Sequence, residues 1–280
     1  MVCVVVFVRG KMNGNHGMYK DLGFVKNQLI CGDCSQELKK LPNESIDLIL
    51  TSPPYYNAKN YSSYQSLDEY MSKLNQIFIE CLRLLKPSRM CIVNISPIIE
   101  KRESRQTQSK RIPLPFYFVP MMEQIGFEFL EDIIWKKPEG AATHRGIFAR
   151  HRKPIAYKPN IVTEYILVFK KPADFLIDKI LKDDSLIIGE YERTNVWEMT
   201  PETRSDHPAP FPEKLAENCI KYYSYENDLV LDPFAGSGTT LKMAKLNNRN
   251  YIGIEISQEY CEIINKRLEK YNNESLTTYI

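Results

Sequence analysis

Residues 228–246 read DLVLDPFAGSGTTLKMAKL and combine an apolar strand, a glycine-rich turn and the start of a helix. Gly236 and Gly238 carry no side chain, as is needed where the backbone turns tightly against a ligand. A helix is expected to begin at Thr239, and the free backbone amides of its first turn can face a polar group of a ligand. Glu255, seventeen residues after Gly238, ends the next predicted strand, where a carboxylate can bind two ribose hydroxyls. A GxG pair alone would indicate only a turn, but this combination predicts a nucleoside-containing cofactor.

The rest of the chain repeats the alternation of strands and helices. Runs dense in Ile, Leu and Val, as in strands covered on both faces, occupy residues 27–32, 45–51, 90–96, 129–135, 163–169, 228–232 and 251–256. The clearest helix lies within 66–87, where Ser66 and Glu69 match a capping box and Pro87 is expected to end the helix. Further helices are predicted at 114–125, 213–223, 239–247 and 258–270. This pattern predicts a doubly wound α/β sheet.

The composition is that of an ordinary globular protein, with 280 residues, 43% hydrophobic and 26% charged. The seven cysteines form no framework spacing, so reduced thiols in a cytoplasmic protein are expected. The CxxC pair Cys31 and Cys34 favours buried thiols flanking a turn over zinc or redox use, and no metal site is predicted. The longest apolar run, residues 2–8, is far shorter than the roughly 18 residues of a membrane span.

Two segments differ from the rest of the chain in charge. Residues 101–111 hold five Lys or Arg against one Glu, and residues 137–160 hold six against one Glu. A solvated loop would explain either segment alone. Two such insertions in a chain of net charge +2 instead indicate a face that binds a polyanion. The candidate contact residues are Arg102, Arg105, Lys110, Arg111, Arg145, Arg150, Arg152 and Lys153.

Two common cofactor motifs are excluded around the glycine-rich turn. The third glycine of the dinucleotide fingerprint is missing, since Thr240 and Leu241 stand there, and no GxxxxGK[ST] loop is present. DPFAGSGTT instead resembles the S-adenosylmethionine-binding motif of DNA amino-methyltransferases. The resemblance implies that Asp232 faces the amino-acid end of the cofactor and that Phe234 packs near its adenosine part.

A second stretch, TSPPY at residues 51–55, resembles the Ser/Asp-Pro-Pro-Tyr catalytic motif of enzymes that methylate exocyclic amino groups of DNA bases. Ser is its usual first residue in the N(4)-cytosine branch. Such an amine is a poor nucleophile because its lone pair is delocalised into the ring. The Ser52 hydroxyl and the Pro53 carbonyl lie in a turn stiffened by Pro54. They can accept hydrogen bonds from the two N–H groups of the amine and so free its lone pair. Tyr55 offers a ring face to a base removed from its stack.

The resemblance extends to shorter elements. CGD places Asp33 at the family's acidic position near the cofactor adenine, and IIWKKP (133–138) resembles the segment after the sixth family motif. HPAPFPEKLAENCI (207–220) resembles an element that borders the methionine end of the cofactor. The expected cofactor-binding residues are Asp33, Thr51, His207, Phe211, Asp232, Phe234, Gly236, Ser237, Gly238, Thr239, Thr240 and Glu255.

The catalytic motif precedes the cofactor motif, which is the permuted order of the family's beta class. That class implies a mostly parallel, seven-stranded, Rossmann-like sheet with a small inserted target-recognition region. The expected division is a flexible extension (1–20), a catalytic half (21–136), a target-recognition region (137–205, with a core strand at 163–171) and a cofactor-binding half (206–280). The implied partner is duplex DNA, with a cognate restriction endonuclease as a further candidate; the oligomeric state stays open.

Three alternatives to N(4)-cytosine methylation stay open. N(6) of adenine requires the same chemistry, but Asp-Pro-Pro-Tyr is commoner there, so Ser52 favours cytosine. An RNA or protein methyltransferase is disfavoured by the SPPY motif and the basic segments. A non-catalytic nucleic-acid-binding module is disfavoured by the intact Ser52, Tyr55, Gly236 and Glu255. Carbon-5 methylation of cytosine is excluded, because it needs a cysteine nucleophile that usually follows proline and the chain has no Pro-Cys dipeptide.

Overall fold

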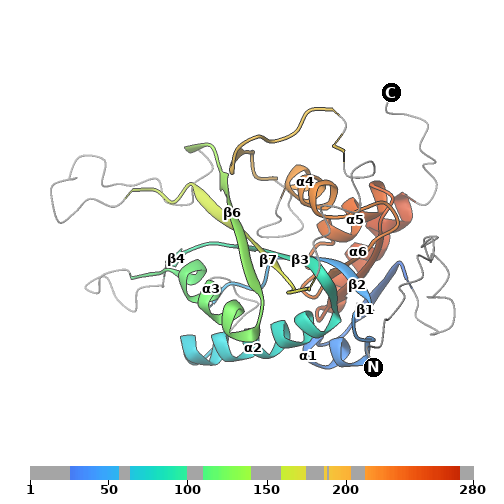
Figure 1. Ribbon diagram of the computed structural model, residues 1–280, viewed down its shortest axis with the longest axis horizontal. Helices are drawn as coiled ribbons and strands as arrows, with labels where there is room; N and C mark the ends of the chain where they lie inside the picture. The colour runs from blue at the N-terminus through green and yellow to red at the C-terminus, as the bar shows by residue number, and fades with distance from the viewer. Residues whose placement is uncertain are drawn as a thin grey trace, which may run out of the picture.

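The computed structural model describes residues 26–56, 64–99, 110–139, 159–174, 186–187, 189–202 and 212–271. These residues form one eight-stranded sheet flanked by helices (Figure 1), in the strand order β1-β10-β9-β2-β3-β7-β6-β8. The strands are β1 (Gln28–Cys31), β2 (Ile46–Thr51), β3 (Leu85–Ile95), β6 (Glu128–Lys136), β7 (Thr163–Lys170), β8 (Val196–Glu198), β9 (Leu229–Asp232) and β10 (Asn250–Glu255). The helices are α1 (Cys34–Glu37), α2 (Leu67–Leu84), α3 (Leu114–Ile125), α4 (Glu213–Tyr223), α5 (Thr239–Leu246) and α6 (Gln258–Lys270).

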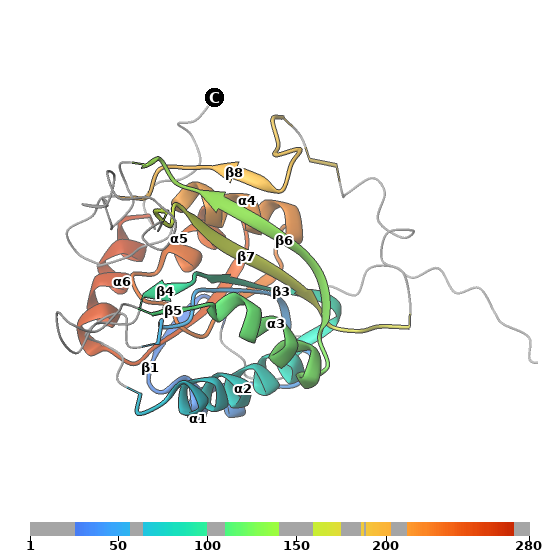
Figure 2. The same cartoon turned by 90° about the vertical axis from the view of Figure 1, so that its left-hand side faces the viewer.

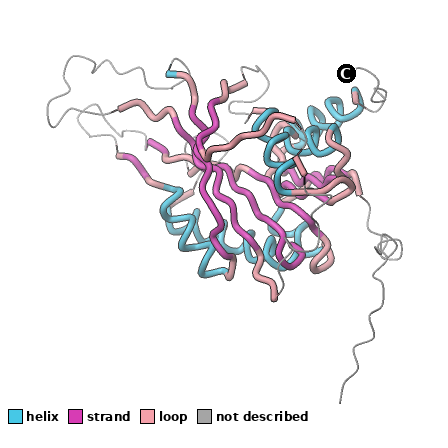
Figure 3. Tube along the Cα trace, turned by 45° about the horizontal axis from the view of Figure 1, so that its top comes forward, coloured by secondary structure: helices cyan, strands magenta, loops and turns pink. Residues whose placement is uncertain are grey.

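The sheet is mostly parallel, and its strands lie side by side in one layer (Figure 3). Strands β1, β10, β9, β2 and β3 run parallel, whereas β7 is antiparallel to both β3 and β6. The predicted doubly wound α/β fold is confirmed, and so are the seven predicted strands. The expected count of seven was wrong, because β8 pairs in parallel with β6 as an eighth. Its three residues, two of them exposed, form too short a run to be recognised in the sequence.

The two faces of the sheet carry different helices (Figure 2). Side chains of α1, α2 and α3 share one buried cluster with Ile49 of β2 and Val93 of β3. Side chains of α4, α5 and α6 share the other with Leu48 and Leu50 of β2 and Ile92 of β3. Successive residues of the central strands therefore face opposite layers, which explains their uninterrupted apolar character. No helix within the described ranges has the length and apolar character that crossing a bilayer would take.

Helix α2 differs from its prediction at both ends. Ser66 Oγ accepts the Glu69 N–H at 3.1 Å, but Glu69 Oε2 accepts the N–H of Gln65 at 2.7 Å, one residue earlier than a capping box requires. The helix ends at Leu84 rather than at Pro87, which lies in β3. Pro87 is tolerated there because the register of β3 against β2 shifts, so the missing N–H interrupts no ladder bond.

The expectation of reduced thiols was wrong at one pair of cysteines. Cys31, at the end of β1, and Cys261, in α6, form a disulfide with their Cα atoms 6.1 Å apart and 230 positions apart in the chain. The fold brings them together because β1 pairs with β10, which α6 follows directly. Cys34 does not pair with Cys31 and is a buried free thiol. Burial raises the pKa of the Cys34 thiol to about 12, so this cysteine is protonated and unreactive at neutral pH.

We expect reduction of the Cys31–Cys261 bond to lower the free energy of unfolding by about 2–4 kcal/mol, because a cross-link between distant positions restricts the unfolded ensemble. Urea unfolding with and without a thiol reductant measures the difference. The double variant Cys31→Ser, Cys261→Ser is the control and should unfold at the same urea concentration in both conditions. Wild-type midpoints that do not respond to the reductant would contradict the expectation.

Candidate active site

The two sequence motifs meet at one edge of the sheet. Strands β2 and β9 are parallel neighbours, with Leu48 opposite Val230 and Ile49 opposite Leu231, so their carboxyl ends lie together. The TSPPY loop follows β2, and the glycine-rich turn follows β9. Thr51 Oγ1 donates to Asp232 Oδ1 at 2.6 Å across this junction, between residues 181 positions apart. Two loops that are remote in the sequence therefore line the same site.

Asp232 is a buried carboxylate at the centre of this junction. Its side chain also accepts the N–H of Phe234 at 3.1 Å. Burial raises the pKa of Asp232 to about 6, although the hydrogen bond from Thr51 acts in the opposite direction. Thr240 donates to the Leu50 carbonyl at 3.3 Å, a second link between the turn and β2. Asp232 is therefore held in place by donors on both loops.

The glycine-rich turn requires its glycines. Gly236 (φ 54°) and Gly238 (φ 79°) both adopt left-handed conformations that side chains disfavour. A Cβ at Gly238 would also come within 3.0 Å of Ile264. Gly238 directly precedes α5, so Thr239 and Thr240 form its first turn and are buried. Ser237 contributes its carbonyl, which accepts from Arg267 of α6 at 2.8 Å. The backbone amides of this turn thus lie at the end of β9.

Glu255 connects the glycine-rich turn to the end of β10. Its Oε2 accepts the N–H of Gly236 at 2.8 Å, and its Oε1 accepts the N–H of Ser257 at 2.8 Å. The expectation that it binds two ribose hydroxyls stays a prediction. The bonds from the two backbone amides leave room for the hydroxyls, because a carboxylate has about four lone pairs and the amides use two of them.

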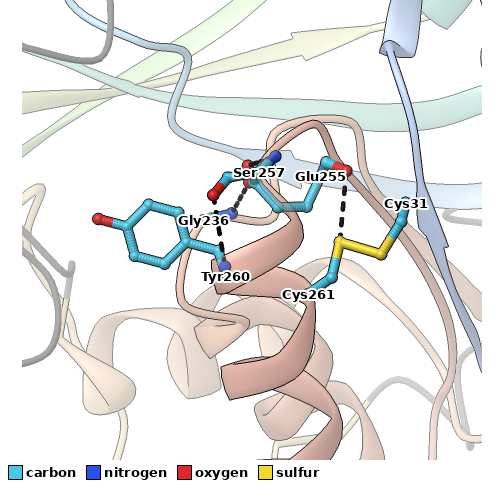
Figure 4. The surroundings of a disulfide bond; sticks show 6 residues. All are labelled: Cys31, Gly236, Glu255, Ser257, Tyr260 and Cys261. Atoms are coloured by element: carbon cyan, nitrogen blue, oxygen red, sulfur yellow. Dashed lines mark hydrogen bonds between the residues drawn. A yellow bond between two sulfur atoms is a disulfide. The ribbon is translucent and has the colours of Figure 1, made fainter.

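Asp33 lies on the next strand end along the same edge. It is exposed and caps α1, with its Oδ1 accepting the N–H of Ser35 at 2.9 Å. The neighbouring Gly32 N–H donates to the Glu255 carbonyl at 2.9 Å, which places the ends of β1 and β10 together. The Cys31–Cys261 disulfide lies beside them (Figure 4), with the Cys261 sulfur 3.5 Å from the Glu255 carbonyl oxygen. The disulfide therefore fixes α6 to the strand that carries Asp33.

The TSPPY loop holds the Ser52 hydroxyl in a defined orientation. Ser52 Oγ donates to the backbone carbonyl oxygen of Asn94, in β3, at 3.2 Å. Asn94 Nδ2 in turn donates to Ser52 Oγ at 3.5 Å. Because the bond to the carbonyl uses the only hydroxyl hydrogen and the Asn94 amide uses one lone pair, the second lone pair of Ser52 is left to accept from another group. Pro53 is buried, whereas Pro54 is partly exposed. The loop can therefore present a fixed acceptor, as the sequence motif predicts.

Tyr55 is anchored through its hydroxyl. Its Oη donates to Glu164 Oε2 at 2.8 Å, and Asn94 Nδ2 donates to the same oxygen at 2.9 Å. Burial, followed by the charge of Glu164, raises the pKa of Tyr55 well above its ordinary value, so the hydroxyl stays a donor at neutral pH. Sequence reasoning missed Asn94 and Glu164. The only available signal was a polar residue within each of two otherwise apolar strands, which is weak.

Several predicted site residues lie outside the described residues: His207, Phe211, Arg102, Arg105, Arg145, Arg150, Arg152 and Lys153. Lys110 and Arg111 are described and exposed. Arg111 lies in β5 (Arg111–Ile112), which pairs with β4 (Ile98–Ile99) two residues beyond β3, and its Nη2 donates to the Pro159 carbonyl at 2.5 Å. The hairpin thus leaves the sheet at the edge that carries Ser52. The described residues contain no cluster of three or more potential metal ligands.

A model of the family described as DNA methylase matches residues 46–266, most of the chain and both loops of the site. The chain belongs to this family of DNA methylases. The sequence is 30% identical over 275 residues to the orphan methyltransferase M.BamHII of Bacillus amyloliquefaciens, covering 86% of this chain and 91% of that protein. It is 32% identical over 266 residues to the type II methyltransferase M.HpaI of Haemophilus parainfluenzae, covering 88% of this chain and 75% of M.HpaI.

A third relative is much longer than this chain. The type II beta methyltransferase M.BslI of Bacillus sp. (strain NEB-606) is 32% identical over 252 residues, 86% of this chain, yet the match spans only 27% of M.BslI. Among solved structures, TTHA0409 of Thermus thermophilus in complex with S-adenosyl-L-methionine is similar, with a TM-score of 0.68 at 26% identity over 87% of this chain and 93% of that one. The PvuII cytosine-N4-specific DNA methyltransferase shares the fold, with a TM-score of 0.67 at 23% identity, covering 90% and 89%.

We expect the pH dependence of stability to reveal the raised pKa of Asp232. With a folded pKa of about 6 against the ordinary 3.8, the folded protein holds this proton between about pH 4 and 6 while the unfolded chain loses it. The carboxyl therefore lowers stability as the pH rises through that window. Relative to wild type, Asp232→Asn should gain about 3 kcal/mol in free energy of unfolding from pH 4 to pH 7, measured by urea unfolding. A difference that is constant with pH would contradict this.

Proposed function

We propose that this protein is a site-specific DNA methyltransferase that transfers a methyl group from S-adenosylmethionine to the exocyclic N(4) amine of cytosine in duplex DNA, by base flipping and direct transfer. Membership of the DNA methylase family supports the reaction class. The observation that carries the proposal is the 2.6 Å hydrogen bond from Thr51 to Asp232, because it joins the loop of the catalytic motif to the loop of the cofactor motif.

The residues at the sheet edge fit S-adenosylmethionine. Three carboxylates lie at the ends of the neighbouring strands β1, β10 and β9: Asp33, Glu255 and Asp232. In this proposal they bind the adenine amine, the ribose hydroxyls and the α-amino group, three polar parts of one cofactor. Phe234 is half-buried beside Asp232 and packs against the adenosine. The similar structure of TTHA0409 holds S-adenosyl-L-methionine, which supports the choice of cofactor. When bound, the cofactor supplies an electrophilic methyl group on a sulfonium.

The catalytic loop prepares the amine. The Ser52 hydroxyl, whose hydrogen is donated to Asn94, accepts one amine N–H, and the Pro53 carbonyl accepts the other. These bonds draw the nitrogen toward a tetrahedral geometry and free its lone pair. The nitrogen lone pair would then bond to the methyl carbon as the carbon–sulfur bond breaks with its electron pair on sulfur, which leaves a neutral thioether. The methylated nitrogen, then cationic, would lose one proton to water. Tyr55 stacks on the flipped base and offsets the cost of its extrusion.

N(6) of adenine is the main alternative substrate, because the same acceptors suit its amine. Serine at position 52, where the adenine enzymes more commonly have aspartate, supports cytosine.

The permuted order, with Ser52 before Gly236, supports membership of the beta class. A competition assay in which duplex DNA and structured RNA are offered together tests whether RNA is the substrate instead; we expect the methyl group on the DNA. The region 137–205 is proposed to recognise the target sequence, except for β7 and β8, which belong to the sheet.

The basic segments are proposed to bind the DNA backbone. Of the candidate contact residues, Lys110 and Arg111 are described, and both are exposed in or directly before β5. Lys137, the first residue of the second segment, is instead largely buried in an ion pair with Glu164. A restriction endonuclease partner and a cytoplasmic location are part of the proposal. The relatives include both a type II methyltransferase and an orphan methyltransferase, so the endonuclease must be sought separately.

We expect Ser52→Ala to lower the turnover of methyl transfer about 100- to 1,000-fold, because it removes one of the two acceptors that activate the amine. Labelled cofactor measures the transfer, and mass spectrometry of nucleosides identifies the product as N(4)-methylcytosine. Ser45→Ala is a matched control at the opposite end of β2, where Ser45 Oγ donates to the Pro42 carbonyl. Its turnover should stay at the wild-type level. Detection of N(6)-methyladenine alone would reject the choice of cytosine.

DNA affinity should fall steeply with salt, because bound Lys and Arg displace counterions from phosphates. Lys110→Gln should weaken binding equally for all sequences and reduce the slope of log K against log [salt] by about one. Lys39→Gln, an exposed lysine before β2 enters the sheet, is the control and should change neither quantity. The same slope in wild type and Lys110→Gln would show that this residue does not contact the backbone.

A further inference from the structure

Glu164 is the meeting point of four segments of the site. It lies in β7, is only 9% exposed, and receives three donors. Tyr55 Oη and Asn94 Nδ2 donate to its Oε2 at 2.8 and 2.9 Å, and Lys137 Nζ donates to its Oε1. The donors come from the catalytic loop, from β3 and from the residue after β6. A carboxylate that collects three donors in a buried place is an organising element rather than a surface charge.

The ion pair with Lys137 is itself part of the packing. Lys137 Nζ lies 4.5 Å from the ring centroid of Trp135, and both members of the pair are largely buried. The Lys137 N–H donates to the Val162 carbonyl at 2.7 Å, so the ends of β6 and β7 are held together by backbone as well. Loss of either charge would leave the other charge buried without an opposite charge beside it, which lowers stability.

We propose that Glu164 is a positioning residue for methyl transfer that acts through Asn94 and Tyr55 on Ser52. This role rests on the proposed function. Glu164 fixes the side-chain amide of Asn94, whose Nδ2 also donates to Ser52 Oγ at 3.5 Å. The Asn94 backbone carbonyl accepts the Ser52 hydroxyl at 3.2 Å, so this residue contacts Ser52 through both side chain and backbone. It also fixes the Tyr55 hydroxyl and with it the tilt of the ring that faces the flipped base. The result is a Ser52 lone pair and a stacking surface held in one relative geometry.

A carboxylate is the only side chain that suits this position. The hydroxyl of Tyr55, the amide nitrogen of Asn94 and the ammonium of Lys137 all donate here, and an ionised carboxylate only accepts. A glutamine of the same shape would turn its NH₂ group toward one of these donors. The raised pKa of Tyr55 is consistent with this arrangement, since it keeps the tyrosine a donor. Glu164→Gln therefore changes the bonding of the network with little change in volume.

The rival explanation is that Glu164 only balances the charge of Lys137. That role would affect folding, and turnover only through the amount of folded enzyme. The positioning role affects turnover in a fully folded enzyme that still binds its ligands. The two explanations therefore predict different splits between kcat and the binding constants.

The first experiment compares Glu164→Gln with wild type on duplex DNA. We expect kcat to fall about 10- to 100-fold, because small displacements of reacting groups cost rates of this order. The Kd values for S-adenosylmethionine and for DNA should change less than about twofold. Glu198→Gln is the matched control, because Glu198 pairs with Lys136, the residue beside Lys137, at an exposed position. This control should keep wild-type kcat.

The second experiment separates positioning from charge balance. Glu164→Gln leaves Lys137 unpaired and should lower the Tm, whereas the double variant Lys137→Met, Glu164→Gln removes both charges and should recover it. If Glu164 positions the loop, kcat stays low in the double variant although the Tm returns. Recovery of kcat together with the Tm would overturn the positioning role.

A third comparison tests the route through Tyr55. Tyr55→Phe keeps the ring and removes the hydroxyl that donates to Glu164. Its effect on kcat should be markedly smaller in the Glu164→Gln background than in wild type, because the two groups act through one contact. An equal effect of Tyr55→Phe in both backgrounds would overturn this route. A wild-type protein that transfers no methyl group to any DNA would reject the proposed function itself, and the positioning role with it.

Discussion

The hydrogen bond from Thr51 to Asp232 is the contact on which the site depends. It is short, at 2.6 Å, and it binds a carboxyl whose pKa burial raises to about 6 although this hydrogen bond lowers it. A buried carboxylate is costly unless its oxygens are bonded, so the two loops hold each other in place through it. Parallel pairing of β2 with β9 makes the bond possible, because it brings their carboxyl ends to one edge. A shift of either strand by one residue would turn one of the two side chains to the opposite face.

Much of this arrangement was predictable from the sequence, for identifiable reasons. The central strands β2 and β9 stand out because both of their faces are buried, so Ile, Leu and Val are dense in them. Strands β1 and β6 are more exposed and were recognised from shorter apolar runs. The glycine-rich turn was readable because glycine adopts the positive φ values of Gly236 and Gly238 more readily than other residues do. Residues that act through local backbone geometry leave a local signal.

What depends on distant packing left no such signal. The Cys31–Cys261 bond joins positions 230 apart, and nothing near either cysteine marks its partner. Glu164 is the second residue of β7 and follows another polar residue, Thr163, so nothing local marks it, and its donors come from three other segments. Helix α2 ends at Leu84 because β3 begins at Leu85. The pairing of β3 in the sheet therefore ends the helix before the local stop signal, Pro87, is reached. For the same reason, the family resemblance identified the motifs but not the network between them.

The chemistry of the site follows the order of the strands rather than the order of the chain. Along one edge of the sheet, β1, β10, β9, β2, β3 and β7 contribute in turn Asp33, Glu255, Asp232, Ser52, Asn94 and Glu164. The first three are carboxylates on the side of the glycine-rich turn, and the last three form one connected set around the TSPPY loop. The boundary between these groups is the β9–β2 junction, where Thr51 meets Asp232. The order of these segments along the chain could therefore differ and the same site would still form, provided that these strands keep their neighbours. In the proposed reaction, a methyl group has to cross only this one junction, from the carboxylate side to the serine side.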